Sequence, residues 1–147
     1  CPKAPKCAAE YQAKLSGPLL DRIDIHIYVP PVSPWDITNK EKGESSAVIL
    51  KRVEAARKIQ KQRFEKYGHR ELLTNSQLKG KLLEEVAALD NDAQKLLIDF
   101  ADKFKLSARG YHRTLRLART IADLQNETNV LRMHIAEALN YRRITPA

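Results

Sequence analysis

Apolar residues recur at helical spacing through most of the chain after residue 46, and this periodicity predicts a series of amphipathic helices. The longest begins after a serine cap at Ser45 or Ser46, runs to about Tyr67 and is ended by Gly68. Its apolar stripe consists of Ile49, Val53, Ala56, Phe64 and Tyr67. The other expected helices are one or two short ones within 78–89, one after Asp90-Asn91-Asp92, one over 107–124 and one opening at Asn129. The pattern is typical of a helical domain.

A different pattern precedes the helices. Isoleucine and valine occupy every second position from Ile23 to Val29, which predicts a half-buried strand that Pro30 and Pro31 end. One strand cannot form a sheet, and residues 1–15 show no sustained periodicity. We therefore expect its partner strands to lie in sequence beyond this chain.

These patterns divide the chain into three parts. Residues 1–31 contain a helical turn and the strand, residues 32–46 form a polar connector, and residues 47–147 form the helical domain. The expected fold class is mainly α, with one strand left over from an α/β core.

Composition supports a folded protein. Of 147 residues, 43% are hydrophobic and 30% are charged, which argues against disorder. No apolar run approaches the roughly 20 residues that span a bilayer, so we expect no membrane partner and a cytoplasmic location. Cys1 and Cys7 could supply half of a zinc site, but their spacing is longer than usual and no other ligands accompany them.

The formal net charge of +8 indicates an anionic partner such as nucleotide or nucleic acid, without choosing between them. Much of it lies on the predicted helix over 46–67. The candidate nucleic-acid contacts there are Arg52, Arg57, Lys58, Lys61 and Arg63. The alternative is that these side chains form a solvated face or pack along the domain.

A row of arginines marks the helix over 107–124. Its apolar side consists of Tyr111, Leu115, Ala118 and Ala122. Arg109, Arg113 and Arg116 fall opposite that side, with no acid between them. Arg109 lies in the first turn, where the helix dipole favours a phosphate. The alternative is a solvated face with one interdomain salt bridge.

Arg22 lies between Asp21 and Asp24, just before the predicted strand. It either pairs with one of these neighbours or points outward at a phosphate. The chain has no GxxxxGK[ST] phosphate loop, so it should not hydrolyse ATP alone.

Two runs resemble a known family. SGPLLDRIDIHIYVP, from Ser16 to Pro30, is similar to the segment that closes the ATPase core of magnesium-chelatase-like AAA+ proteins of the YifB and ComM type. SARGYHRTLRLARTIADL, from Ser107 to Leu124, resembles their lid helix, and the basic run RVEAARKIQKQRF between them also fits the family pattern. The resemblance covers nearly the whole chain.

The resemblance implies a ring-forming ATPase that binds ATP and Mg²⁺ at its subunit interfaces. Arg22 would be an arginine finger acting on the neighbouring subunit's nucleotide. Arg109 would be the sensor-2 arginine of the lid, with Arg113 beside it at the nucleotide. Cys1 and Cys7 would be the downstream half of a zinc-binding cysteine cluster. The isolated chain would hold no cofactor, since the Walker loops are absent.

The implied partners are the rest of the ATPase core, further copies in a ring, expected to be a hexamer, and DNA. The expected function is that of a lid and subunit-interface region in a DNA-processing motor, a branch-migration helicase. The alternatives are a subunit of a true magnesium chelatase and a freestanding basic helical DNA-binding module.

Overall fold

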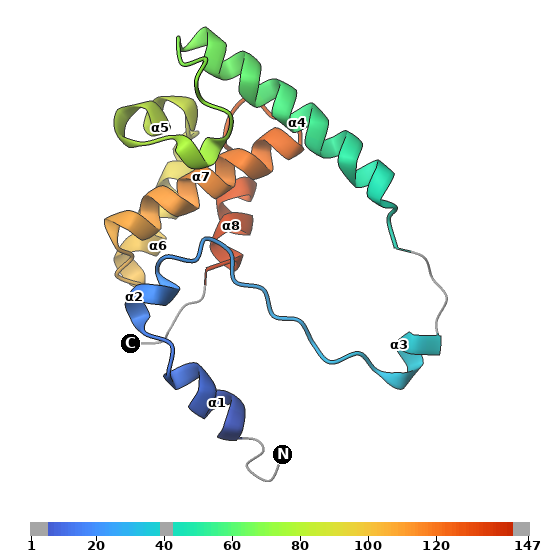
Figure 1. Cartoon of the computed structure of the whole chain (residues 1–147). Coiled ribbons are helices and arrows are strands. Elements are labelled where there is room, and N and C mark those ends of the chain that lie inside the picture. Colours follow the sequence, from blue (N-terminus) through green and yellow to red (C-terminus); the bar gives the residue numbers. More distant parts are fainter. Residues whose placement is uncertain (1–5, 39–42, 143–147) are drawn as a thin grey trace.

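The structure is a computed structural model that describes residues 6–38 and 43–142, and it is helical (Figure 1). Its helices are α1 Lys6–Ala13, α2 Gly17–Leu20, α3 Pro34–Thr38, α4 Ser46–Lys66, the 3₁₀ turn η1 Asn75–Gln77, α5 Gly80–Val86, α6 Asn91–Lys103, α7 Ala108–Leu124 and α8 Arg132–Asn140. The described residues contain no sheet, only an isolated parallel bridge between Leu89 and Val130. The mainly α fold class is confirmed.

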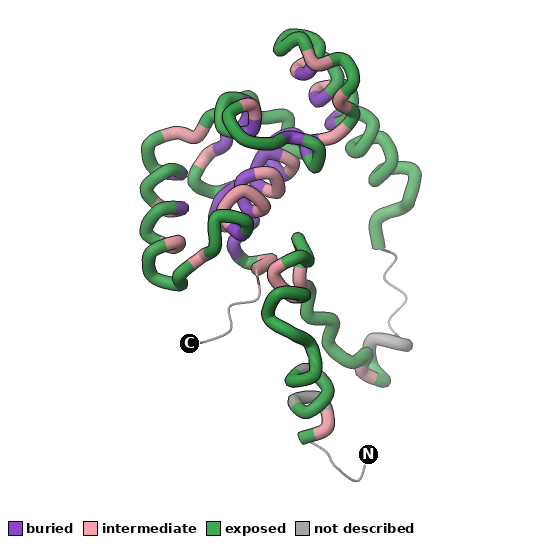
Figure 2. The backbone as a smooth tube through the Cα atoms, turned by 60° about the vertical axis from the view of Figure 1, so that its left-hand side comes forward, coloured by how far each residue is buried: buried purple, intermediate pink, exposed green. Residues whose placement is uncertain are grey.

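Helix α7 forms the centre of the domain. It packs against α8, α4, α5 and η1, and α6 packs against α8. Figure 2 shows the buried positions concentrated along α7. Its predicted apolar side is confirmed, because Leu115, Ala118 and Ala122 are buried and Tyr111 packs against the core. Because the apolar side of α7 is held in the core, Arg109, Arg113 and Arg116 lie on the opposite side of the helix.

Local capping explains where the helices begin and end. The Ser107 hydroxyl accepts a hydrogen bond from the Gly110 amide at 3.0 Å, and the Asp90 carboxylate accepts one from the Ala93 amide at 2.6 Å. Each bond satisfies an amide that lacks a partner within its own helix. Beyond α4, Gly68 adopts a φ of +77°, the left-handed conformation that suits glycine after a helix.

Only the second half of α4 belongs to the core. Ala56, Gln60 and Phe64 are buried against the rest of the domain. The first half extends past α7, and its apolar residues Val48, Ile49, Leu50 and Val53 are exposed (Figures 1 and 2). The predicted stripe is therefore confirmed at Ala56 and Phe64 and wrong at Ile49, Val53 and Tyr67, which are exposed.

The strand predicted at residues 23–29 does not form. This segment has no regular secondary structure, and Ile27 and Val29 are 69% and 79% exposed. A strand needs a neighbour to accept and donate its backbone hydrogen bonds, and the described residues provide none. Two short helices went unpredicted: α1, in the segment without periodicity, and α3, within the connector.

Candidate functional site

The candidate site lies where the N-terminal segment meets the N-terminus of α7. Asp21 accepts hydrogen bonds from the Ser107 hydroxyl at 3.3 and 3.4 Å, and its Oδ1 lies 3.2 Å from Nη2 of Arg142. The amide of His26 donates to the Tyr141 carbonyl at 2.8 Å. Residues 21–26 are thus joined to both the start of α7 and the end of α8. The two motif runs identified in the sequence come together here.

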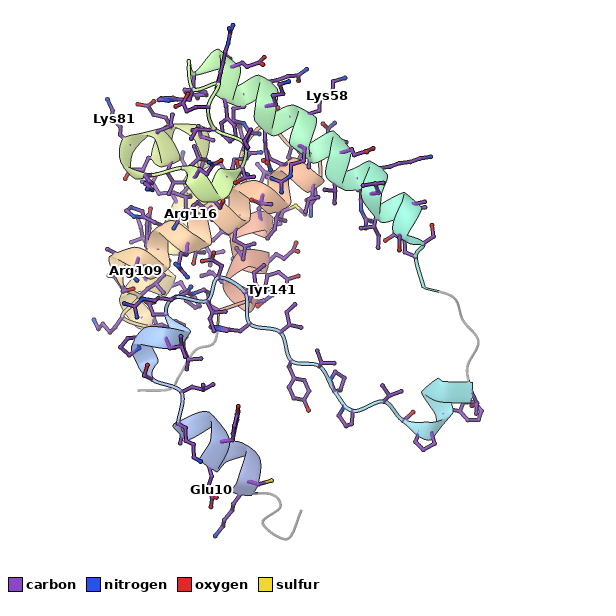
Figure 3. The ribbon with its side chains drawn as sticks, viewed as in Figure 1. Glu10, Lys58, Lys81, Arg109, Arg116 and Tyr141 are labelled. Atoms are coloured by element: carbon purple, nitrogen blue, oxygen red, sulfur yellow. The ribbon has the colours of Figure 1, made fainter. Side chains whose placement is uncertain are left out.

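Arg109 is exposed in the first turn of α7 (Figure 3). Among the described residues, its guanidinium has no hydrogen bond or ion pair. The helix dipole disfavours a cation at this end of a helix. Since Arg109 has no such partner, its guanidinium is available to an anion that approaches the N-terminus of α7.

The other two arginines of the row already have partners. Nη1 of Arg113 lies 2.8 Å from Oδ1 of Asp24, an ion pair whose angles are not those of a hydrogen bond. Arg116 donates from Nη1 to the carbonyl oxygens of Ser76 and Leu78, both at 3.3 Å. A salt bridge between the N-terminal segment and α7 is therefore present, at Arg113.

Arg22 is exposed at the end of α2. Nη1 donates a hydrogen bond to the Pro18 carbonyl at 3.3 Å. The neighbouring acids, Asp21 and Asp24, pair with Arg142 and Arg113 instead. The simple alternative for Arg22, an ion pair with an adjacent aspartate, does not occur.

Gly110 allows a close approach at the start of α7. A Cβ at this position would lie 2.7 Å from Cδ1 of Leu106 and 3.1 Å from Nη2 of Arg142. The 2.7 Å contact is closer than real Cβ atoms come, so a larger residue would displace Leu106, and it would also crowd Arg142. The glycine of SARGYHR thus leaves room for both side chains beside α7.

The candidate nucleic-acid residues on α4 differ in their availability. Lys58 and Lys61 are exposed, and Figure 3 shows Lys58 on the side of α4 away from α7. Arg52 pairs with Glu44 at 2.8 Å, and Arg57 donates to Oε1 of Gln60 at 3.0 Å. The side chain of Arg63 is only 14% exposed and binds Asp123 in the domain interior.

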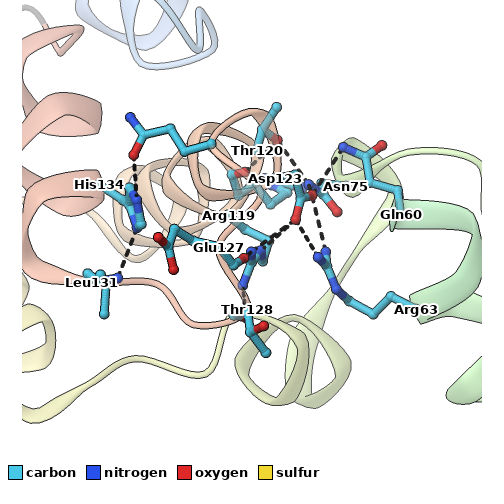
Figure 4. Close-up of polar contacts among 12 residues, drawn as sticks. Gln60, Arg63, Asn75, Arg119, Thr120, Asp123, Glu127, Thr128, Leu131 and His134 are labelled. Carbon is cyan, nitrogen blue, oxygen red and sulfur yellow. Dashed lines mark hydrogen bonds and ion pairs between the residues drawn. The ribbon is translucent and has the colours of Figure 1, made fainter. Parts of the chain in front are cut away.

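Asp123 is the centre of a buried polar cluster that sequence reasoning missed (Figure 4). Its carboxylate accepts hydrogen bonds from two guanidiniums and two amides on α4, η1 and α7. The donors are Gln60 at 3.2 Å, Arg63 at 3.1 Å through Nη1 and also through Nη2, Asn75 at 2.8 Å, and Arg119 at 3.0 Å. The cluster therefore ties the basic helix to α7.

Arg119 is the second missed residue. Its side chain is fully buried and also donates to the Thr128 carbonyl at 2.7 Å. Burial lowers the pKa of Arg119, while the adjacent Asp123 carboxylate raises it. Two signals could have revealed the pair: Arg119 follows the core residue Leu115 by one helical turn, and Asp123 follows Arg119 by another.

His134 is buried at the start of α8. Its Nδ1 accepts a hydrogen bond from the Leu131 amide at 3.0 Å, so Nε2 carries the proton and donates to Oε1 of Gln125 at 2.9 Å. Burial lowers the pKa of His134, and the positive charge of Arg119 lowers it further. The lowered pKa and the two hydrogen bonds hold the imidazole in its neutral form as a structural residue.

The proposed zinc half-site is only partly visible. Cys1 lies outside the described residues, and Cys7 is a free, half-buried cysteine. Within residues 6–38 and 43–142, no cluster of three or more histidine, cysteine, aspartate or glutamate residues could hold a metal ion. In that same part of the chain, no helix has the length and apolar composition needed to cross a bilayer.

Comparison with known proteins finds a matching family for the helical region and another for the N-terminal segment. Residues 43–142 match the family described as magnesium chelatase, subunit ChlI C-terminal, and residues 1–37 match magnesium chelatase, subunit ChlI. The chain is 38% identical over 140 residues to competence protein ComM of Haemophilus influenzae and 36% identical over 141 residues to YifB of Salmonella typhimurium. It is 35% identical over 153 residues to a protein of Mycobacterium tuberculosis.

These alignments cover 95% of this chain for the first two relatives and 97% for the third. The chain spans 26% of the length of the first two and 30% of the third. The matched region is therefore one part of a longer protein in each relative. The chain belongs to the magnesium-chelatase-like family of the YifB and ComM type and corresponds to its C-terminal part.

Proposed function

We propose that this chain is the lid and subunit-interface region of a magnesium-chelatase-like AAA+ ATPase. Arg109 contacts the nucleotide bound by its own subunit and reports its state to the lid. Arg22 reaches the nucleotide of the neighbouring subunit and neutralises charge on the transferring phosphoryl group. The complete protein works as a homo-oligomeric ring, a hexamer, in the cytoplasm.

One observation carries this proposal: Arg22 and Arg109 are exposed with their charge uncompensated, while the cations around them are paired. Arg113, Arg116 and Arg142 each bind an acid or a carbonyl oxygen of the domain. Arg22 binds a single neutral carbonyl, and Arg109 has no partner among the described residues. Exposed guanidiniums of this kind suit an anionic ligand with several oxygens.

The family implies ATP and Mg²⁺ for the complete protein. Arg109 fits the phosphate part of ATP, because an arginine in the first turn of a long helix suits a phosphate group. The chain lacks a Walker loop, so the remaining phosphate contacts and the Mg²⁺ ligands come from elsewhere in the protein. The described residues do not fit zinc.

We further propose that the motor acts on DNA, as a branch-migration helicase. One relative is a competence protein, and the chain has a net charge of +8, which suits DNA better than a porphyrin. The second candidate, a subunit of a true magnesium chelatase, is supported by the matching family descriptions. Assaying both branched-DNA unwinding and metal insertion with the complete protein separates the two.

The nucleotide roles are tested in the complete ATPase with Arg22→Ala and Arg109→Ala. We expect each to lower ATP turnover, by about 10³-fold for the arginine finger, with the protein still folded. Arg70→Ala removes an exposed arginine outside this region and should leave turnover unchanged. Wild-type turnover in both site variants would refute the assignments.

Mixing experiments separate the two roles. A variant with an inactivated phosphate-binding loop is combined with either arginine variant. Mixing it with Arg22→Ala should restore turnover, because an intact finger from one subunit then meets an intact loop in its neighbour. Mixing it with Arg109→Ala should restore none, because Arg109 and the loop must lie in the same subunit. The reverse pattern would exchange the two roles.

A further inference from the structure

Polar contacts join residues 21–26 to the helical domain at several points. Ile23 and Ile25 remain 40% and 44% exposed, so neither is fully buried in the core. A hollow of about 320 Å³ lies beside the segment, lined by residues that include Asp24, Ile25, Arg113 and Arg116. Because no apolar side chain of this segment is fully buried, its charged and hydrogen-bonded contacts contribute to its placement.

The ion pair between Asp24 and Arg113 joins the segment to the second turn of α7. Arg113 is largely buried, with 18% of its side chain exposed, while the Asp24 side chain is 58% exposed. A largely buried guanidinium is costly to leave without a counter-charge. Asp24 supplies that charge, so the pair favours one position of the segment on α7.

The same pair gives Arg113 a different role from the one expected of a nucleotide ligand. Its guanidinium is directed to Asp24, one helical turn beyond Arg109 on the same helix. Asp24 in turn lies two residues after Arg22. The ion pair thus links the segment that carries Arg22 to the helix that carries Arg109.

We infer that Asp24 and Arg113 are positioning residues that make Arg22 move with the lid. The inference rests on the proposed function. If α7 shifts when Arg109 engages nucleotide, the pair transmits that shift to Arg22 at the interface with the next subunit. Each subunit's own nucleotide would then control how its finger is presented to its neighbour.

The test uses the complete ATPase with Asp24→Asn, Arg113→Gln and the double variant. Each single variant should lower kcat by about tenfold, which corresponds to a typical interaction energy between two residues in contact. The KM and Kd for ATP should stay unchanged. The kcat of the double variant should be no lower than that of either single variant, because all three variants remove the same ion pair. Asp24→Glu retains the charge and should recover most of the lost turnover.

Lys81→Gln serves as the control, because it removes an exposed ion pair, with Glu85 at 3.6 Å, away from this segment. It should leave kcat unchanged. Weaker ATP binding in Arg113→Gln alone would show that Arg113 is a nucleotide ligand and overturn the inference. Unchanged turnover in Asp24→Asn would overturn it too. If Arg22→Ala and Arg109→Ala lower turnover while Asp24→Asn does not, the proposed function stands and only the positioning role fails.

Discussion

The carboxylate of Asp123 is enclosed by two guanidiniums, from Arg63 and Arg119, and its side chain is fully buried. Burying ionised groups carries a large desolvation cost, which their attraction offsets only when the remaining hydrogen bonds are also made. Here Gln60 and Asn75 supply further donors. Such a cluster favours one register between α4 and α7, because sliding either helix would leave buried charges without partners.

Asp123→Asn should therefore destabilise the domain strongly. The amide keeps the shape of the carboxylate but leaves Arg63 and Arg119 without their counter-charge, at an expected cost of about 3 kcal/mol. Urea unfolding of the chain measures the difference in free energy. Asp99→Asn neutralises an exposed aspartate on α6 and should change the stability by less than about 0.5 kcal/mol. Equal stability of the two variants would show that the cluster contributes nothing.

His134 gives the stability a pH dependence with a definite sign. Its folded-state pKa is lowered, so the folded chain binds fewer protons than the unfolded chain once the pH falls below about 6.5, the ordinary pKa of histidine. Stability is complete above that pH and is lost as the pH falls toward the folded-state pKa. Thermal unfolding between pH 7.5 and 5 should show Tm decreasing.

His134→Gln is the matched variant for this prediction. Glutamine at the third position of a helix can accept the same backbone hydrogen bond from Leu131, but it does not titrate in this range. The decrease in Tm over this pH interval should be smaller in the variant. A decrease as large as that of the unchanged chain would assign the effect to other groups.

At the scale of elements, the sequence predicted those helices whose signals are local. Asp90 and Ser107 cap α6 and α7, and Gly68 follows α4, whose N-cap residue Ser45 makes no capping hydrogen bond. Each of these helices begins and ends within a few residues of its expected limits. Capping residues and apolar periodicity depend on neighbours within one or two turns, so they can be recognised in the sequence without a structure. The apolar side of α7 was predictable for the same reason.

The failures share a different physical origin. The alternation from Ile23 to Val29 predicted a strand, but a strand is stable only against a neighbour, and no described residue pairs with it. The stripe on α4 likewise predicted burial at Ile49 and Val53, where no element packs. Amphipathic patterns show which face an element prefers to bury but do not supply the partner.

The candidate site was predictable only in part. Sequence reasoning selected Arg22, Arg109 and Arg113, and the structure adds that Arg113 is paired with Asp24. Sequence reasoning also counted Arg63 among the exposed cations of α4, whereas its side chain binds Asp123 in the interior of the domain. Both pairs join residues far apart in the chain, which no local pattern can reveal.

For the whole molecule, the excess of positive charge is unevenly placed. Helix α4 carries seven basic and two acidic side chains. Several of these cations have partners within the chain, such as Arg52 and Arg63, whereas Lys58 and Lys61 are exposed with no partner among the described residues. If the chain binds DNA, the free lysines of α4 are the side chains best placed to contact phosphates.

The double variant Lys58→Ala/Lys61→Ala tests this location. Losing two phosphate contacts should weaken DNA binding similarly for all sequences and reduce the slope of log K against log salt by about 2. The variant Lys79→Ala/Lys95→Ala removes the same charge from exposed positions off α4 and should leave the slope nearly unchanged. Fluorescence anisotropy with branched and duplex DNA over a salt series measures both. Equal losses in the two variants would mean that net charge, not α4, attracts DNA, and absence of binding at low salt would remove DNA as a partner of this region.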